Sequence, residues 1–286
     1  GIASDSYAVN VGSDGPFTGA ATCMGYALFF KENALHKLYG SKPADFQLSS
    51  LRCRGVARNA GRSLCVLNET LYYLSADGVM AWDGSIPTKV STALDAGKLS
   101  NVTRAVGGAL DGRYYLHLER ADGARLLVYD TERGLWQEED VCSYEMASTG
   151  GQLYLWDTQA LWAADPSRER DWQDPAGTET SLPFELTTGE MGLDAAENVY
   201  LSRLTLRLEA ARRTRLQLAV SYDGGAWEVL DERVLDGEKK SLDLTFAPRR
   251  CGTLRLHLQG EGQLTLRSLA KTLSTAKGKI LEEEEM

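Results

Sequence analysis

The sequence predicts an all-β protein with two domains: a β-propeller-like repeat domain of about four blades and a jelly-roll-like β-sandwich. Three observations lead to this prediction. Short strand–turn–strand segments recur roughly every 40 residues, a stretch rich in proline and charge follows them, and longer strands with alternating leucines come last. We expect the propeller domain at 1–176, the sandwich at 177–276 and an acidic flexible tail at 277–286.

Four copies of one short pattern define the predicted blades. LYYLSADGVMAWDG (71–84) aligns without a gap with ALFFKENALHKLYG (27–40), and further copies occupy 114–130 and 153–165. The copies begin at residues 27, 71, 114 and 153, so they are 44, 43 and 39 residues apart. This spacing of short alternating strands is typical of a propeller blade, because one four-stranded sheet cannot bury both of its faces alone.

Glycines and aromatic residues accompany the third copy, where Gly107 and Gly108 precede Tyr114 and Trp136 follows. This arrangement resembles a kelch-type blade. We expect the glycines to permit close approach of strands and the aromatic rings to fill the space between blades. Four blades are the minimum for a closed ring, so the sequence leaves open a closed ring or an arc of a larger propeller. A plain antiparallel sandwich with chance similarity is the alternative.

Tight hairpins are predicted at four Asp-Gly pairs: Asp77-Gly78, Asp83-Gly84, Asp111-Gly112 and Asp122-Gly123.

The second domain is predicted from a change in amino-acid composition and in the pattern of the strands. The stretch PSRERDWQDPAGTETSLP (166–183) is typical of a linker or long loop. Beyond it, alternation of the kind Leu204-Thr205-Leu206 places leucines on one face of each strand and polar residues on the other, as in a sandwich. Strands are predicted at 200–210, 214–222, 241–248, 253–260 and 263–271.

Composition excludes several classes of function. The net charge of -9 argues against nucleic acid as a partner, and no apolar run approaches the roughly 18 residues of a membrane helix. The five cysteines contain no CxxC pair, so we expect neither a metal finger nor a bound metal, and we interpret them as thiols in a reducing compartment. No GxSxG nucleophile elbow and no phosphate-binding loop is present. We therefore predict no cofactor and assign no catalytic residue.

The string SYDGGAW (221–227) is the most site-like motif, and it resembles the Asp-box of sialidase-like propellers. It is one residue short, lacks the hydroxyl residue before Trp227, and occurs once. We interpret it as a hairpin between two sandwich strands, with Trp227 packed against the protein. His36, His117 and His257 each stand alone on a predicted strand, so we interpret them as structural.

Two groups of residues are candidates for contacts with a ligand or partner. Trp156, Trp162 and Trp172 could stack on sugars, although packing within blades is the more ordinary role of such residues. Arg212, Arg213 and Arg215 are dense enough to bind an anion, and we expect them in a connection between strands.

The run from LYYLSADGVMAWDGS to PTKVS, with YLSRLTLRLE, LAVSYDGGAWEVL and LTLRSLAKTL further on, resembles tail, hub or packaged-DNA stabilisation proteins of tailed phages and prophages. The resemblance spans about 26–272. It implies a non-enzymatic assembly part of a phage particle, located in the virion or the bacterial cytoplasm, that contacts other particle proteins or itself. The first alternative is a secreted or cell-surface carbohydrate-binding or adhesion module with glycans as partners, and the second is a sialidase-like glycoside hydrolase. No membrane partner is expected.

Overall fold

The structure, a computed structural model, describes residues 8–139, 145–164, 183–192, 199–247, 249, 251–275 and 280–282. The described residues form antiparallel strands, turns and two short 3-10 helices, η2 (Pro43–Asp45) and η3 (Ala96–Leu99). The chain divides into two compact units, Gly1–Arg168 and Glu169–Met286. The predicted all-β class, propeller-like repeat and β-sandwich are confirmed. The predicted domain boundary at 176/177 lies outside the described residues.

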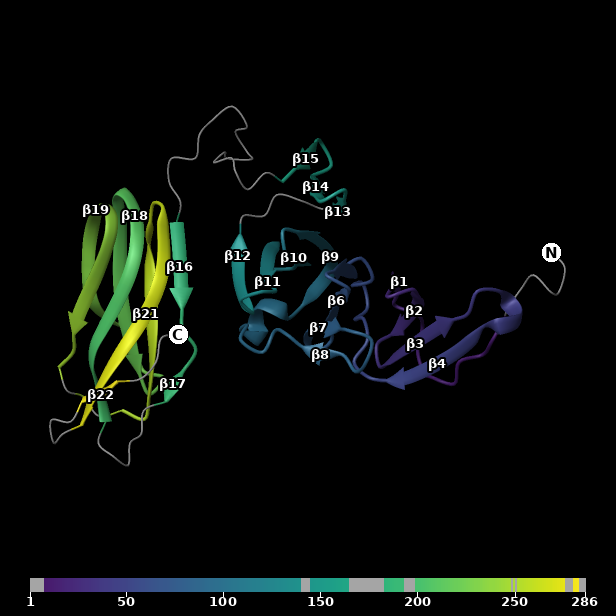
Figure 1. Cartoon of the computed structure of the whole chain (residues 1–286), viewed down its shortest axis with the longest axis horizontal. Helices are drawn as coiled ribbons and strands as arrows, with labels where there is room; N and C mark the ends of the chain where they lie inside the picture. The colour runs from purple at the N-terminus through teal and green to yellow at the C-terminus, as the bar shows by residue number, and fades with distance from the viewer. Residues whose placement is uncertain are drawn as a thin grey trace. The chain divides into compact units, whose positions relative to one another are not determined.

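Unit 1 (Gly1–Arg168) consists of four antiparallel sheets that follow one another in chain order (Figure 1). The first holds β1 (Gly19–Cys23), β2 (Tyr26–Lys31), β3 (Ala34–Tyr39) and β4 (Gln47–Arg52). The second holds β5 (Cys65–Leu67), β6 (Thr70–Ser75), β7 (Gly78–Trp82) and β8 (Thr88–Lys89). The third holds β9 (Val102–Leu110), β10 (Arg113–Arg120), β11 (Arg125–Asp130) and β12 (Leu135–Glu139). The fourth holds β13 (Glu145–Thr149), β14 (Gln152–Trp156) and β15 (Leu161–Ala163). Each sequence copy corresponds to the second and third strands of one sheet.

The turn between the first two strands has the same length and the same backbone conformation in all four sheets. In all four sheets this turn has two residues, and both have positive φ. A two-residue turn with two positive φ values matches the twist of the strands that it joins and fixes their register. The four pairs are Met24-Gly25, Asn68-Glu69, Asp111-Gly112 and Gly150-Gly151.

Glycines lie where neighbouring blades approach most closely, as the sequence predicted. A Cβ on Gly107 would lie 2.3 Å from the Ser63 carbonyl oxygen of the preceding blade, and one on Gly108 would lie 2.6 Å from Leu153 of the following blade. The Tyr114 hydroxyl donates to the same Ser63 carbonyl (2.8 Å), and its ring stacks on Tyr72. One hydrophobic core joins the first three sheets and a second joins the third and fourth, and neither joins the first sheet to the fourth.

The segment before β1 covers the outer side of the first sheet. Its Ser13 hydroxyl lies 2.8 Å from His36 Nε2, and its Phe17 ring contacts the ring of His36 edge-on. The other ring nitrogen, Nδ1, lies 2.7 Å from the Ser50 hydroxyl. Lys31 Nζ donates to the Ser13 carbonyl (2.6 Å) and lies over the Phe17 ring. These contacts bury His36 to 2% exposure, so the segment and the sheet share one polar cluster.

Unit 2 (Glu169–Met286) is the sandwich. Its strands are β16 (Pro183–Thr187), β17 (Met191–Gly192), β18 (Val199–Tyr222), β19 (Glu228–Thr245), β20 (Thr253–Glu261), β21 (Leu264–Thr275) and β22 (Ile280–Glu282). The first half of β18 pairs with β21 and its second half with β20, while β19 accompanies it throughout. The two halves therefore belong to two layers, which enclose one leucine-rich core.

Two predictions of element bounds differ from the structure. The strands predicted at 200–210 and 214–222 are one strand, β18, with a register shift between Arg212 and Thr214 and a positive φ of 68° at Arg213. A bulge bends a strand without ending it, so the arginines lie within β18 and not in a connection. In the predicted tail, Ile280–Glu282 pairs with β21, and the remaining tail residues lie outside the described residues.

Candidate ligand-binding face of the C-terminal unit

The motif SYDGGAW forms the hairpin that the sequence predicted. Asp223 and Gly224 have φ values of 49° and 70°, and the Gly225 amide donates to the Tyr222 carbonyl (2.8 Å). Asp223 Oδ1 accepts hydrogen bonds from the amides of Gly252 (2.7 Å) and Thr253 (2.9 Å). The carboxylate thus fastens the hairpin between β18 and β19 to the start of β20.

Trp227 packs against the surface of the protein, and its side chain is 41% exposed. Its ring centroid lies 5.2 Å from that of His257 and 5.6 Å from the guanidinium carbon of Arg255, both on β20. Trp227 leads into β19, which pairs with β18 on the side away from β20. Its ring must therefore reach across β18 to make these contacts.

Two small residues on β18 explain how the ring lies. Ala219 and Ser221 alternate with the core residues Leu218 and Val220, so they point outward, yet they are only 4% and 3% exposed. Ala219 and Ser221 are the register partners of His257 and Arg255, the two residues that the Trp227 ring contacts. Small side chains at these two positions leave room for a large ring on the outer side of β18.

Polar side chains form a row beside this ring. The row crosses four strands through Glu185 on β16, Gln259 on β20, Gln217 on β18 and Glu232 on β19, which are register partners in that order. Gln259 Nε2 donates to Gln217 Oε1 (2.5 Å), and Gln217 Nε2 donates to Glu232 Oε2 (3.5 Å). We call Trp227, Arg255, His257 and these four residues the Trp227 face.

The row is held in place before any ligand arrives. His257 Nε2 lies 3.1 Å from Glu185 Oε1 at one end of the row. The hydrogen bonds between the side chains fix the orientation of both glutamine amides. Side chains that are already oriented lose less conformational entropy when they bind. The face therefore combines an open aromatic plane with oriented hydrogen-bonding groups.

The two carboxylates of the row are too far apart for paired acid–base chemistry. Three strand spacings of about 4.8 Å separate Glu185 from Glu232, or about 14 Å, whereas the carboxylates of glycoside hydrolases lie about 5–9.5 Å apart. Within the described part of the chain, no group of three or more His, Cys, Asp or Glu side chains could hold a metal ion.

The predicted tryptophans are not brought together. Trp156 on β14 is 44% exposed, while Trp162 on β15 is half-buried, packs against the core and donates from Nε1 to Asp157 Oδ2 (3.0 Å). Trp162 is paired with the inward Leu155, and Trp156 with Leu161, so the two indoles lie on opposite faces of their sheet. Trp172 lies outside the described residues.

The predicted arginines lie at the bulge of β18, where Arg213 and Arg215 are exposed. Arg215 is two residues from Gln217 and points to the same side as the Trp227 face, opposite Glu261 in the register. Arg212 and Arg213 lie at the bend between the layers. Only Arg215 therefore adjoins the candidate site.

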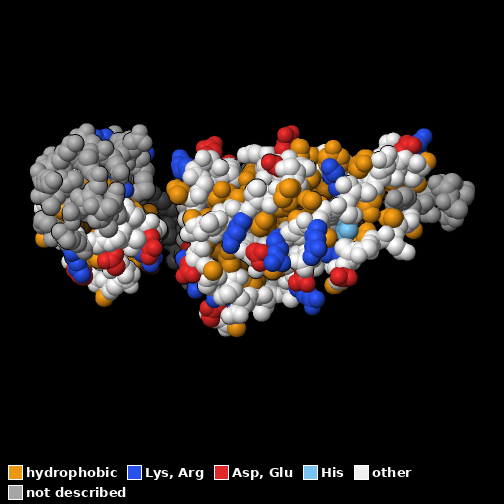
Figure 2. Space-filling view, turned by 90° about the horizontal axis from the view of Figure 1, so that it is seen from below, with side chains coloured by type: hydrophobic (Ala, Val, Ile, Leu, Met, Phe, Trp, Pro, Cys, Tyr) orange, Lys and Arg blue, Asp and Glu red, His pale blue; other side chains and the backbone are white. Residues whose placement is uncertain are grey.

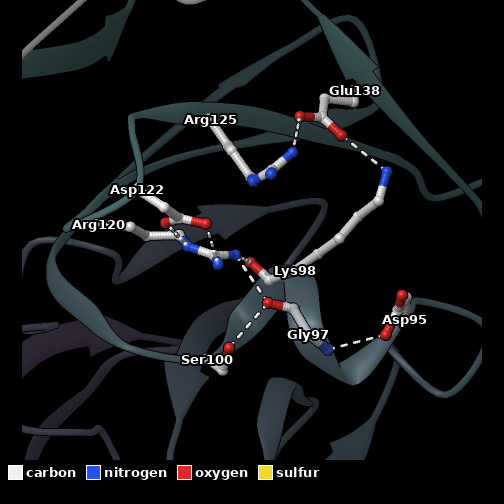
Figure 3. A network of polar contacts seen from close by, with 8 residues as sticks. All are labelled: Asp95, Gly97, Lys98, Ser100, Arg120, Asp122, Arg125 and Glu138. Atoms are coloured by element: carbon white, nitrogen blue, oxygen red, sulfur yellow. Dashed lines mark hydrogen bonds and ion pairs between the residues drawn. The ribbon is translucent and has the colours of Figure 1, made fainter.

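A polar network in unit 1 consists of ion pairs and of hydrogen bonds to backbone carbonyls (Figure 3). The Arg120 guanidinium, with 7% of the side chain exposed, donates to the carbonyls of Gly97 (2.7 Å) and Lys98 (2.8 Å) and pairs with Asp122. Lys98 and Arg125 both bind Glu138 and lower the pKa of its carboxyl, outweighing the burial that would raise it. Both of these carboxylates have a cationic partner, so the network fastens η3 to the third sheet.

Ion pairs also join three blades of unit 1. Glu145 pairs with Arg62 (2.7 Å) and with Arg104, and Arg104 also pairs with Glu119 (2.7 Å). Figure 2 shows Lys and Arg side chains standing among Asp and Glu side chains on the face of unit 1 drawn there. Mixed charge of this kind fits structural pairing.

Burial of thiols and chain hydropathy add two observations. Cys23, Cys53, Cys65 and Cys251 are free thiols, and burial raises the pKa of Cys65 to about 11. The remaining cysteine, Cys142, lies outside the described residues. Across the described chain, no helix has the length and apolar character needed to cross a bilayer.

The sequence prediction missed the Trp227 face, although part of its signal was readable. Small residues alternate with core residues at Ala219 and Ser221, directly before a hairpin that ends in tryptophan. That pattern leaves space on the outer side of β18 for a large ring. The row itself needs the register of four strands, which residue spacing does not provide.

No protein-family model and no curated protein sequence matches the chain. Among solved structures, it is similar to the exo-β-1,3-galactanase of Phanerochaete chrysosporium in complex with galactose. That pair shares 10% identity over 84% of this chain and 78% of the other, with a TM-score of 0.31. A variant of the same enzyme in complex with β-1,3-galactotriose gives 9% identity, the same coverage and a TM-score of 0.32. A glycoside hydrolase gives 10% identity over 87% of this chain and 83% of the other, with a TM-score of 0.29.

These comparisons contradict two linked expectations, that the chain is a non-enzymatic assembly protein of a phage particle and that it is not an enzyme, because the structures found are glycoside hydrolases. The physical reason for the error is that short Asp-Gly hairpins and alternating aromatics are what any small antiparallel blade requires. They indicate a fold and say nothing of its use. A phage or prophage origin stays a prediction. At TM-scores of 0.29 to 0.32 the function must be argued from the residues of this chain.

Proposed function

We propose that unit 2 binds carbohydrate through the Trp227 face. The observation that carries the proposal is the ring of Trp227, which lies against His257 and Arg255 while 41% of the side chain stays exposed. Aromatic side chains that are apolar on the face and fixed by packing beneath are suited to stack on the C–H face of a sugar ring.

The row beside the ring supports a sugar over a purely apolar ligand. Gln259, Gln217 and Glu232 offer oriented donors and acceptors on three adjacent strands, and hydroxyl groups both donate and accept. An apolar ligand would desolvate the donor and acceptor atoms that the row's own hydrogen bonds leave open to solvent, which costs free energy for each such atom. A polyhydroxylated ligand satisfies them and covers the indole at once.

Binding to polysaccharides tests the proposal. Affinity electrophoresis of the whole chain through gels that contain cellulose derivatives, xylan, galactan, pectin or glycol chitin should reveal retardation in at least one gel. Trp227→Ala should weaken that retardation about tenfold, equivalent to about 1.4 kcal/mol. Trp156→Ala is the matched control, because it removes an equally exposed tryptophan from unit 1 and should leave the retardation unchanged.

Two outcomes would overturn the proposal. The first is that no polysaccharide retards the wild-type chain. The second is that Trp156→Ala abolishes retardation while Trp227→Ala does not, which would move the binding site to unit 1. A thermal unfolding curve of each variant shows whether a loss of binding reflects a loss of folding.

A further inference from the structure

We infer that the ligand of the Trp227 face is a linear, uncharged oligosaccharide of at least three units, which lies across the strands of the sheet. This inference rests on the proposed function and specifies its substrate class. It comes from the extent, direction and charge of the polar row, which are independent of the tryptophan that carries the proposal.

The extent of the row sets the number of units. Glu185, Gln259, Gln217 and Glu232 lie on four adjacent strands, so the row is about 14 Å long at about 4.8 Å per strand. One strand spacing is close to the length of one pyranose unit. Three linked units are therefore needed to reach from one end of the row to the other.

The hydrogen bonds give the row a direction across the strands. Gln259 donates to Gln217, and Gln217 donates to Glu232, so the amide groups point the same way along the row. Successive units of a linear sugar chain present similar hydroxyl groups at regular intervals. A row of similar side chains at strand spacing can bind such hydroxyls one after another, which a single sugar cannot exploit.

The position of Trp227 supports an extended ligand. The ring contacts His257, which lies two residues from Gln259 on β20 and so borders the row. A sugar unit on the ring would border the middle of the row, because Gln259 and Gln217 lie two residues from the register partners His257 and Ala219. It would leave Glu185 and Glu232, at the two ends of the row, without contact. A monosaccharide should therefore use only part of the face.

The charge of the row indicates an uncharged chain. Both ends of the row are carboxylates, Glu185 and Glu232, and a uronic acid unit placed beside either one would meet like charge. The arginines Arg255 and Arg215 lie outside the row, in the flanking rows of the sheet. Neutral units avoid the repulsion and still use both carboxylates as acceptors.

Isothermal titration calorimetry with a length series tests the inference. The probes are oligomers of one to six units, prepared from the neutral polysaccharide that retards the wild-type chain. Affinity should rise at least tenfold from one unit to three and change little beyond four. Gln217→Ala should remove most of this rise. Thr205→Ala, on the other layer of the same strand β18, is the control and should behave as wild type.

The outcomes separate the two claims. If one and three units bind equally well, the inference is overturned while the carbohydrate-binding function stands. If Gln217→Ala leaves the length dependence intact, the row is not the binding surface and the inference fails again. If the chain is retarded only in a gel that contains a polyuronate such as pectin, the inference that the ligand is uncharged is wrong. If no probe of any length binds, the proposed function itself fails.

Discussion

Gly107 and Gly108 illustrate how single residues decide the packing of this protein. Both lie on β9, and a Cβ on Gly107 would meet a backbone carbonyl oxygen at 2.3 Å, a contact that no side-chain rotation can relieve. We expect Gly107→Ala to lower the free energy of unfolding of unit 1 by about 1–3 kcal/mol, as other overpacked sites do. Chemical denaturation monitored by circular dichroism measures this loss.

Gly12→Ala provides the control for this prediction. Nothing lies within 4 Å of a Cβ at Gly12, and its φ is outside the left-handed region. The variant should have wild-type stability. If Gly107→Ala is equally stable, the blades do not approach each other at this point as closely as described.

Single residues also show where sequence reasoning reached its limit. The glycine pair and the hairpin at Asp223-Gly224 were predictable, because φ and close approach depend on local chemistry. The position of Trp227 was not, since the same motif serves a buried or an exposed ring. The ring contacts His257 and Arg255 on β20, and only the register places the small residues Ala219 and Ser221 opposite them on β18.

At the scale of elements, the segment before β1 depends on a neutral His36. Burial and the charge of Lys31 lower the pKa of His36, while in the unfolded chain the pKa is about 6.5. The stabilisation is therefore complete above about pH 6.5, declines as the pH falls below this value, and is lost once the pH passes the folded-state pKa. A protonated ring would also face the Lys31 ammonium, with Ser13 and Ser50 on either side.

His36→Gln tests this dependence, because glutamine hydrogen-bonds without titrating. The free energy of unfolding of wild type should fall more steeply between pH 7.5 and pH 5 than that of the variant. His117, whose pKa burial also lowers, is present in both proteins, so its contribution cancels in the comparison. Equal pH dependence in the two proteins would show that His36 does not couple the segment to the sheet.

Elements with local signals were the ones that the sequence predicted well. The copy at 71–84 corresponds to β6 and β7, since alternation and turns delimit both strands. The break predicted within β18 was wrong, because Arg212-Arg213-Thr214 has the polarity of a loop while its backbone stays in the ladder. The first half of β19, from Glu228 onward, was missed because charged residues interrupt its alternation.

At the scale of the whole molecule, the two units have separate hydrophobic cores with no residue in common. We therefore expect two transitions in differential scanning calorimetry. Leu206→Ala, at a fully buried position of unit 2, should cost about 2–5 kcal/mol and lower the midpoint of one transition only. Gly107→Ala should lower the midpoint of the other. A single transition that both variants shift equally would mean that the units unfold together.

The same separation explains why function was harder to predict than fold. The repeat in unit 1 is easy to recognise in the sequence because every blade packs against its neighbours in the same way. The candidate site lies in unit 2, where seven side chains from five segments meet through register alone. The predicted Trp156, Trp162 and Trp172 were chosen because they belong to the conspicuous repeat, and Arg215 is the one predicted residue that adjoins the site.

The continuity of β18 has a consequence for how the sandwich resists cleavage. Three arginines within four residues, Arg212, Arg213 and Arg215, would be an early target for trypsin if they lay in a loop. Here they belong to a strand that serves both layers. A protease must wait for this strand to leave the sheet, and such an opening disrupts the whole core at once. Cleavage at these three arginines therefore requires unfolding of unit 2 as a whole, so the global stability of unit 2 protects them.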